Sequence, residues 1–426
     1  MKKVLIITYY WPPSGGAGVQ RWLKFSKYLP EFGCQPVILT VDERQASYAQ
    51  TDYSLLQEVS PDLKVFKTKT FEPYNLYRKL TNKKEIPYGG FSNQKKITLF
   101  EKLSRFVRGN FFIPDPRKGW NSYALQKALE LIRTEKIETV ITSGPPQSTH
   151  LIGVKIKQLT GIKWIADFRD PWTDIYYYKD LYLSRLAARY DKKLEKKVLS
   201  EADKIITVSG EVGKLLLNKI PGSEAKIVVI PNGYDESDFK DVAIIKNDCF
   251  TIAYVGTISA SYRIGGFIDA ISLLPGNIRE QIKIRFVGNV PDEILQLFHL
   301  KNLGSMVEVL GYIPHEMAVA QMVNASMLLM AIPDSPDNKG IVTGKFFEYL
   351  AAGRPILAIG PLGGDVDHLV QKCTAGKLFS YDEKEKMQLH ILEVFDLYRN
   401  GLFLNETTGT DRFTRRNLTK ELTNQL

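Results

Sequence analysis

The sequence predicts an α/β protein built from two wound, mainly parallel sheets with helices on their faces. Three observations predict this fold class. Short apolar runs alternate with helical patterns along most of the chain. The alternation begins afresh near residue 250. A length of 426 residues suits two or three domains, each with its own core.

The first wound unit is predicted to cover about 230 residues. Its two clearest helices are expected at 19–33 and 148–161. Its strands are expected, in order, at 3–10, 36–42, 137–144, 163–168, 203–209 and 226–233. The turn-rich "PNGYD" at 231–235 is the natural hinge that follows.

The second unit repeats the pattern. Helices are expected at 267–275, 315–325 and 343–353, and a basic, amphipathic terminal helix at 410–426. The expected strands are 250–256, 282–288, 307–313, 327–334 and 354–360. Ligands of such sheets bind at the carboxyl ends of the strands, near helix N-termini. Two units with facing edges would suit a reaction of two substrates.

The composition favours an anionic partner. Lys and Arg total 57 against 47 Asp and Glu, a net charge of +10. We expect no nucleic acid, because no basic stripe with interleaved aromatic residues occurs.

Three scattered cysteines and five ungrouped histidines predict free thiols and no protein-built metal site. No apolar run approaches the roughly 18 residues of a membrane span, so we expect a cytoplasmic protein.

The loop "SGGAGVQR" follows the first predicted strand and contains Gly15, Gly16 and Gly18. A dinucleotide fingerprint read from Gly16 fails, because Arg21 stands where its third glycine belongs. The loop still allows backbone N–H groups to approach an anion. Simple turn geometry is the alternative.

The stretch "GIVTGKFFEYLAAGRPILAIG" at 340–360 resembles a phosphate loop without its metal-binding hydroxyl. Thr343 is expected to cap a helix that starts near Gly344, whose free N–H groups favour an anion. Lys345 opposes the helix dipole, a local cost that a bound diphosphate would explain. Glu348 lies one turn further on, where it suits ribose hydroxyls or an ion pair with Lys345.

Two further charged groups follow predicted strands. Arg263 precedes Gly265 in the second unit, where it could reach a phosphate or remain a solvated loop arginine. "WIADFRDPW" at 164–172 groups Asp167, Arg169 and Asp170 at the end of a strand. Three charges at that place indicate an active site or a structural salt-bridge cluster.

These segments together resemble family 4 glycosyltransferases, which are retaining enzymes of the GT-B architecture. The resemblance spans nearly the whole chain and is carried by "PPSGGAG", "ADKIITVS", "IPNGYD", "YVGTIS", "FVG", "VLGYIPHEM" and "GKFFEYLAAGRPILA". "IPDPRKGW" and "WIADFRDPW" are similar to a bacterial subgroup associated with cell-surface polysaccharide assembly. The resemblance implies an acceptor domain at 1–233, a donor domain at 234–408, and a final helix at 409–426 that crosses back to the first domain.

The chain departs from the family pattern at three places. Glu348 matches the second of two glutamates spaced eight apart, but Gly340 stands at the first. Thr257 replaces the arginine that often follows the "VG" glycine. The usual histidine of the first domain is not evident, and Asp167, Arg169 or Asp170 would occupy its region.

The resemblance implies same-face attack on a nucleotide sugar, without a metal or other cofactor. The expected catalytic residues are Asp167, Arg169, Asp170, Arg263 and Lys345. The expected donor-binding residues are Gly15, Gly16, Gly18, Gly256, Arg263, Gly311, Val342, Thr343, Gly344, Lys345 and Glu348. The acceptor would be a saccharide or a lipid-linked saccharide. A nucleotide-sugar 2-epimerase and a non-catalytic scaffold of similar fold are the alternatives.

A segment at 95–114 predicts a basic amphipathic helix. Its expected apolar face holds Ile97, Phe100, Leu103, Phe106 and Val107, with Lys95, Lys96, Lys102, Arg105 and Arg108 around it. Such a helix can lie on an anionic bilayer as a peripheral contact. Packing of the same face onto its own domain is the alternative.

Overall fold

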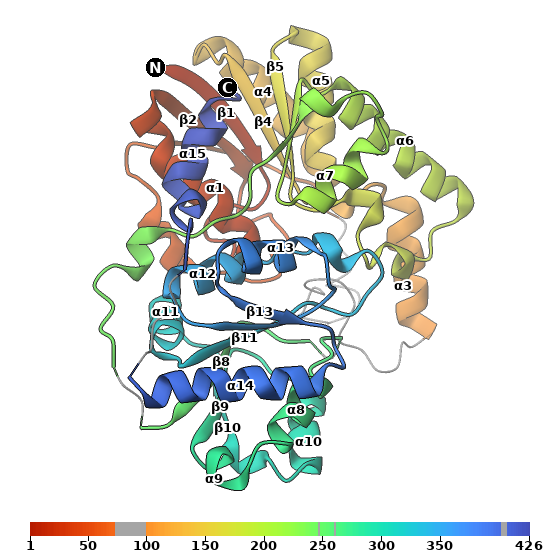
Figure 1. Cartoon of the computed structure of the whole chain (residues 1–426). Helices are drawn as coiled ribbons and strands as arrows, with labels where there is room; N and C mark the ends of the chain where they lie inside the picture. The colour runs from red at the N-terminus through yellow and green to blue at the C-terminus, as the bar shows by residue number, and fades with distance from the viewer. Residues whose placement is uncertain (73–98, 246–247, 260, 402–406) are drawn as a thin grey trace. The chain divides into compact units, whose positions relative to one another are not determined.

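The computed structural model describes residues 1–72, 99–245, 248–259, 261–401 and 407–426. The described chain divides into an N-terminal unit, 1–231 with 415–426, and a C-terminal unit, 232–414. Each unit contains one parallel sheet covered by helices (Figure 1). The predicted fold class is thus confirmed. The division falls inside the "PNGYD" segment, and the terminal helix belongs to the N-terminal unit.

The N-terminal sheet has seven parallel strands in the order β3-β2-β1-β4-β5-β6-β7. They are β1 (Lys2–Thr8), β2 (Cys34–Val41), β3 (Lys64–Thr68), β4 (Thr139–Gly144), β5 (Lys163–Phe168), β6 (Lys204–Thr207) and β7 (Ile227–Val229). Strand order reverses between β1 and β4. Wound sheets bind ligands at the carboxyl side of that reversal.

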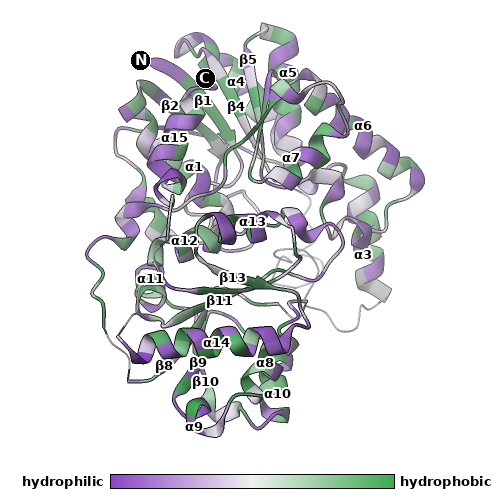
Figure 2. Cartoon of the chain, in the orientation of Figure 1, coloured by the Kyte–Doolittle hydropathy of each residue, from purple (hydrophilic) through white to green (hydrophobic). Residues whose placement is uncertain are grey.

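Helices cover both faces of this sheet (Figure 1). The helices of this unit are α1 (Ala17–Tyr28), α3 (Leu99–Phe111), α4 (Asn121–Thr134), α5 (Ser148–Thr160), α6 (Arg185–Glu201), α7 (Gly210–Leu217) and α15 (Arg415–Thr423), of which α3 contacts α6 and not the sheet. Because both faces are buried, the central strands are nearly continuous apolar runs, as Figure 2 shows. α15 packs on α1 through Leu418 and Leu422, which are buried.

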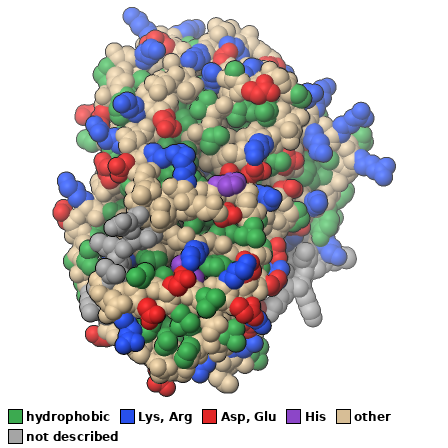
Figure 3. Space-filling model, in the orientation of Figure 1, with side chains coloured by type: hydrophobic (Ala, Val, Ile, Leu, Met, Phe, Trp, Pro, Cys, Tyr) green, Lys and Arg blue, Asp and Glu red, His purple; other side chains and the backbone are tan. Residues whose placement is uncertain are grey.

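The segment predicted to form a basic amphipathic helix is described from Leu99 onward, as α3. Leu103, Phe106 and Val107 are exposed, whereas Arg105, expected at the polar margin, is buried. Of the other expected members, Ile97, Lys95 and Lys96 lie outside the described residues, and the Phe100 side chain is not described. The alternative that Leu103, Phe106 and Val107 pack onto their own domain is therefore wrong. Figure 3 shows Lys and Arg side chains projecting from the edge at which Figure 1 shows α6.

The C-terminal sheet has six parallel strands in the order β10-β9-β8-β11-β12-β13. They are β8 (Phe250–Val255), β9 (Ile282–Val287), β10 (Val307–Gly311), β11 (Met327–Ala331), β12 (Ile356–Ile359) and β13 (Gly376–Phe379). Its helices are α8 (Gly265–Ser272), α9 (Gly276–Arg279), α10 (Asp292–Leu300), α11 (His315–Asn324), α12 (Gly344–Ala352), α13 (Asp365–Lys372) and α14 (Lys384–Arg399). Here the strand order reverses between β8 and β11.

Two edge strands, β3 and β13, were not predicted. β3 reads "KVFKT" and is only partly buried, while β13 is four residues long and begins with a glycine. Edge strands are short and charged because one side remains unpaired, so neither shows the apolar run of a central strand. In the described ranges, every helix is too short or too polar to traverse a lipid bilayer.

Candidate functional site

The glycine loop after β1 leads directly into α1 at the N-terminal reversal point. Gly16 precedes the helix with φ 91°, a conformation that favours glycine. A Cβ on Gly18 would lie 2.7 Å from Nη1 of Arg169, so only glycine allows this approach. The N–H of Gly15 donates to the carbonyl of Gln50 at 2.9 Å. Because this N–H already has an acceptor, the expectation that it binds an anion is wrong for Gly15.

Arg169 holds the loops around the carboxyl edge together. Its Nε donates to the Gly144 carbonyl at 3.0 Å, its Nη2 to the Pro145 carbonyl at 2.7 Å, and its Nη1 to the Gly18 carbonyl. Burial lowers the pKa of Arg169. This side chain joins the loop after β4 to the first turn of α1, so it positions the site.

Asp167 is a core residue and not an exposed acid. It is 0% exposed, and its carboxylate accepts from Arg21 Nη2 at 3.0 Å, Trp22 Nε1 at 2.8 Å and Ser143 Oγ at 2.9 Å. Arg21 also donates to the carbonyl of Pro231 at 3.0 Å. These bonds occupy the carboxylate, which corrects the expectation that Asp167 touches substrate. Arg21, which breaks the glycine fingerprint, is its ion-pair partner.

Asp170 differs from Asp167 in exposure and in hydrogen bonding. It follows β5 and is partly exposed, and no hydrogen bond or ion pair joins its side chain to another described residue. Burial raises the pKa of this carboxyl group, and the nearby Arg169 opposes that shift. Asp170 is thus the partly exposed carboxylate of this segment.

His150 is a residue that the sequence analysis missed. It is fully buried at the start of α5, with Nδ1 2.9 Å from Thr142 Oγ1 and its ring stacked on Phe168. Its Nε2 has no hydrogen-bond partner among the described residues. Burial lowers the pKa of His150 to about 3, so the ring is neutral at physiological pH. Its position inside an apolar helical pattern gave no signal of this buried, partly unpartnered ring.

Three neighbouring strands of the C-terminal sheet have a glycine at their carboxyl ends. Gly256, Gly288 and Gly311 end three neighbouring strands with φ values of 117°, 117° and 67°. The N–H of Gly256 donates to the Val287 carbonyl and that of Gly288 to the Gly311 carbonyl, both at 2.7 Å. A Cβ on Gly288 would lie 2.7 Å from the Gly256 oxygen. At these three strand ends the chain therefore presents backbone without a side chain.

Lys345 lies at the reversal point between β8 and β11. It is the second residue of α12, which begins at Gly344 as predicted. Its Nζ donates to the Tyr254 hydroxyl at 2.8 Å and is 4.2 Å from the centre of that ring. A Cβ on Gly256 would lie 2.8 Å from Nζ. Burial lowers the pKa of Lys345 to about 8, so this ammonium lacks the solvation of a surface lysine.

The residues around Lys345 keep the helix N-terminus open. A Cβ on Gly344 would meet nothing within 4 Å. Thr343 is at the N-cap position but makes no capping bond, and its hydroxyl is buried without a partner in the described chain. The expected capping bond is therefore wrong. The charge of Glu348 raises the pKa of Lys345, while Val342 is buried in the core and supplies packing.

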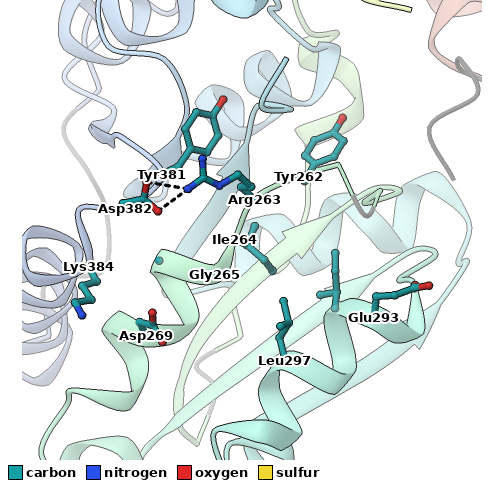
Figure 4. Close-up of a pocket in the computed structure, with 12 residues that line it drawn as sticks. Tyr262, Arg263, Ile264, Gly265, Asp269, Glu293, Leu297, Tyr381, Asp382 and Lys384 are labelled. Carbon is teal, nitrogen blue, oxygen red and sulfur yellow. Dashed lines mark hydrogen bonds and ion pairs between the residues drawn. The ribbon is translucent and has the colours of Figure 1, made fainter. Parts of the chain in front are cut away.

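Arg263 is already paired. Its Nη1 lies 2.7 Å from Asp334 Oδ2 and its Nη2 2.6 Å from Asp382 Oδ1, and the side chain is 51% exposed. It lines a pocket of about 450 Å³ that is bounded by α10 and by the segments that lead into α8 and α14 (Figure 4). Arg263 is thus not the unpaired cation that the sequence suggested, because two carboxylates bind it.

Part of the chain matches a known protein family. Residues 89–238 match the model of Glycosyltransferase Family 4. This match covers less than half of the chain and falls almost entirely within the N-terminal unit. None of the curated protein sequences compared with the chain matches it.

Solved structures of similar fold match the whole chain. A sucrose-phosphate synthase from Thermosynechococcus elongatus is 15% identical with a TM-score of 0.64, covering 100% of this chain and 98% of its own. Anabaena HepE in complex with UDP-glucose is 14% identical with a TM-score of 0.61, covering 100% and 99%. A Listeria monocytogenes protein described as a UDP-N-acetylglucosamine 2-epimerase is 10% identical with a TM-score of 0.56, covering 99% and 95%. At these identities the likeness establishes the GT-B fold.

No evident metal centre occurs in the part of the chain that the structure describes. No three His, Cys, Asp or Glu side chains are grouped there as potential ligands. In the described residues, the charged side chains near the two reversal points include Lys345, Arg169 and Asp170, besides the buried Asp167–Arg21 pair.

Proposed function

We propose that the protein transfers a sugar from a nucleotide-sugar donor to a hydroxyl group of an acceptor, with retention of anomeric configuration. One observation carries the proposal: a poorly solvated ammonium at an open helix N-terminus, at the reversal point of the C-terminal sheet. Such a group stabilises the negative charge of a departing nucleoside diphosphate. The bound UDP-glucose of the Anabaena protein supports a nucleotide-sugar donor.

Each unit has its own part in this proposal. Lys345 and the first amides of α12 hold the diphosphate, and Glu348 holds ribose hydroxyls. Gly256 and Gly311 let the donor approach the backbone. Arg263 reaches the phosphates only after leaving Asp334 and Asp382. In the N-terminal unit, Asp170 binds the acceptor hydroxyl, while Arg169 positions the loops.

The acceptor class follows from the family resemblance. The segments "IPDPRKGW" and "WIADFRDPW" favour a saccharide or lipid-linked saccharide in bacterial cell-surface polysaccharide or glycolipid assembly. We therefore propose that the enzyme acts in the cytoplasm or at the inner face of the membrane. The net charge of +10 agrees with anionic substrates.

A panel of sugar nucleotides tests the proposal directly. Release of nucleoside diphosphate would be measured with and without candidate acceptors, and the anomeric configuration of the product read by NMR. Slow donor hydrolysis without acceptor favours transfer. Recovery of an epimerised donor would favour the 2-epimerase alternative, for which the Listeria protein gives the structural precedent. No turnover despite donor binding would favour a scaffold.

Activity is expected to survive EDTA. The phosphates are assigned here to a lysine and a helix N-terminus, and the hydroxyl that would hold Mg²⁺ in a phosphate loop is replaced by Phe346. Turnover would be compared before and after dialysis against EDTA. Loss of activity that Mg²⁺ or Mn²⁺ restores would contradict this assignment of the donor site.

Donor affinity is expected to fall above pH 8. The pKa of Lys345 is lowered from 10.5 to about 8, so a rise in pH through 8 removes the charge that binds the diphosphate. Between pH 8 and 10.5 Lys345 is protonated in the unfolded chain but mostly neutral in the folded one. The free energy of unfolding therefore increases with pH in this range, while donor affinity decreases. Calorimetric titration of nucleoside diphosphate from pH 7 to 10 measures the effect. An equal decline in Lys345→Ala would refute it.

A further inference from the structure

Two buried polar atoms face the same space at the carboxyl end of β4. A Cβ on Gly144, the last residue of this strand, would lie 2.5 Å from His150 Nε2 and 2.6 Å from Gln147 Oε1. Neither atom has a hydrogen-bond partner among the described residues. A buried polar atom without a partner lowers stability, so proteins seldom keep one without a reason. Two such atoms that converge on one point indicate a place for a ligand.

Hydrogen bonds on the far side of the imidazole determine which nitrogen of His150 carries the proton. The indole of Trp164 can only donate, and its Nε1 donates to Thr142 Oγ1 at 2.9 Å. In the described chain, the acceptor left for the hydrogen of that hydroxyl is His150 Nδ1, also at 2.9 Å. Nδ1 therefore accepts, and the neutral ring carries its proton on Nε2. His150 thus presents an N–H group to Gly144, and Gln147 presents a carbonyl oxygen.

Packing holds the ring in this orientation. The imidazole is stacked on Phe168, with ring centres 4.5 Å apart and planes inclined by 14°. A Cβ on Gly153 would lie 2.2 Å from the Trp164 indole, so α5 needs a glycine to approach this side chain. Gln147 is the partly exposed member of the pair, whereas His150 is fully buried. A ligand therefore reaches the histidine from the side of Gln147.

One donor beside one acceptor selects a particular chemical group. A carboxylate or phosphate only accepts hydrogen bonds and would face the Gln147 oxygen, while an ammonium only donates and would face the His150 N–H. A hydroxyl group does both, so it satisfies the two atoms at once. Asp170, whose carboxylate is proposed to bind the acceptor hydroxyl, follows β5, the strand that pairs with β4. The pair and this carboxylate thus lie at neighbouring strand ends.

We infer that His150 and Gln147 form a subsite for a second hydroxyl group of the acceptor, besides the one that Asp170 binds. The acceptor is then a sugar or another polyol that presents two hydroxyl groups, and not an alcohol with one. Thr142 and Trp164 are positioning residues, because they act on the ligand through the proton of His150. The inference rests on the proposed function for the identity of the acceptor, but binding at the pair needs no transfer.

NMR of the full chain with ¹⁵N-labelled histidine tests the pair without turnover. The His150 ring, identified by its loss in His150→Gln and by its shift in Thr142→Val, should carry its proton on Nε2. Methyl glycosides of glucose, galactose and N-acetylglucosamine, added without nucleotide, should include one that shifts this Nε2 signal. Thr142→Val should move part of the proton to Nδ1, a result that a merely structural threonine would not give.

Three results of these spectra would overturn the inference. A proton on Nδ1 in the wild type would remove the donor that the subsite needs. No shift with any of the glycosides would leave the pair to a bound water. A shift that requires a nucleotide sugar would assign the pair to the donor instead of the acceptor.

Deoxy glycosides show whether a ligand hydroxyl meets Gln147. In the wild type, removal of the bound hydroxyl is expected to weaken glycoside binding about tenfold, the effect of one or two hydrogen bonds. Gln147→Leu should reduce this preference to about threefold, because the bond from His150 remains. The matched control Gln158→Leu makes the same change at an exposed glutamine of α5 and should keep the tenfold preference. Thermal unfolding would show that both variants are folded.

The outcomes for the subsite and for the transfer reaction are separate. The full tenfold preference in Gln147→Leu would overturn the inference, and so would deoxy glycosides that all bind as tightly as their parents. Glycoside binding at the pair without any sugar transfer would support the subsite and contradict the proposed function. Sugar transfer to a glycoside that leaves the His150 signal unchanged would do the reverse.

Discussion

Lys345→Ala is expected to lower donor binding or turnover roughly 10- to 100-fold, because a hydrogen bond to a charged group contributes about 1.5–3 kcal/mol. The Lys345 ammonium is partly buried, has one neighbouring hydroxyl and lies against Gly256. A diphosphate would supply the charge that this site lacks. The fold should persist, since removal of a cation from the first turn of α12 relieves an unfavourable interaction with the helix dipole.

Titration with free nucleoside diphosphate separates the roles of neighbouring residues, because this ligand carries ribose and phosphates but no sugar. Glu348→Ala should mainly raise KM for the donor if the carboxylate binds ribose. Arg263→Ala should act on the diphosphate as Lys345→Ala does, with a smaller effect because Asp334 and Asp382 compete for the guanidinium. If Lys345→Ala binds nucleoside diphosphate and turns over as wild type does, the lysine is structural.

Asp167→Ala is expected to destabilise the N-terminal unit by about 3–5 kcal/mol, the cost of leaving one partner of a buried ion pair without the other. Arg21 is 1% exposed and would keep its charge beside Trp22 and Ser143, both of which also lose their acceptor. For a unit of this size the unfolding temperature should fall by roughly 6–20 °C. Calorimetry or circular dichroism measures this shift.

Asp170→Asn provides the control three residues away. Asp170 has no partner among the described residues, so its substitution should leave the unfolding temperature nearly unchanged and lower turnover instead. Substitution of Asp167 should thus lower the unfolding temperature, whereas substitution of Asp170 should lower turnover. Full turnover by Asp170→Asn would remove it from the acceptor site, and a stable Asp167→Ala variant would contradict the structural role of the ion pair.

The sequence predicted the central strands well because their residues are apolar for a physical reason. "KVLIITYY" and "FTIAYVG" are buried on both faces of a parallel sheet, so each is a continuous apolar run that identifies a central strand. The helix at 344–352 was predicted within one residue because Gly344 and Gly353 mark its ends. β3 and β13 could not be found in this way, since edge strands need few apolar residues.

Site residues were harder to predict than elements, because a residue type does not reveal its partners. Three charges in "WIADFRDPW" looked equivalent, yet Asp167 pairs with Arg21, which is 146 positions away. Arg263 looked unpaired, but its partners Asp334 and Asp382 follow other strands. The approach of Lys345 to Gly256 joins β8 to α12, and only the strand order of the sheet brings them together.

The three carbonyl contacts of Arg169 have a consequence for how this scaffold can diversify. Gly18, Gly144 and Pro145 offer main-chain oxygens to the guanidinium, and main-chain oxygens are present whatever the side chain. Side chains elsewhere in these two loops can therefore be exchanged without loosening their attachment. Under the proposed function, substitutions of loop side chains can change acceptor preference one residue at a time. The conformation of the loops depends instead on Arg169.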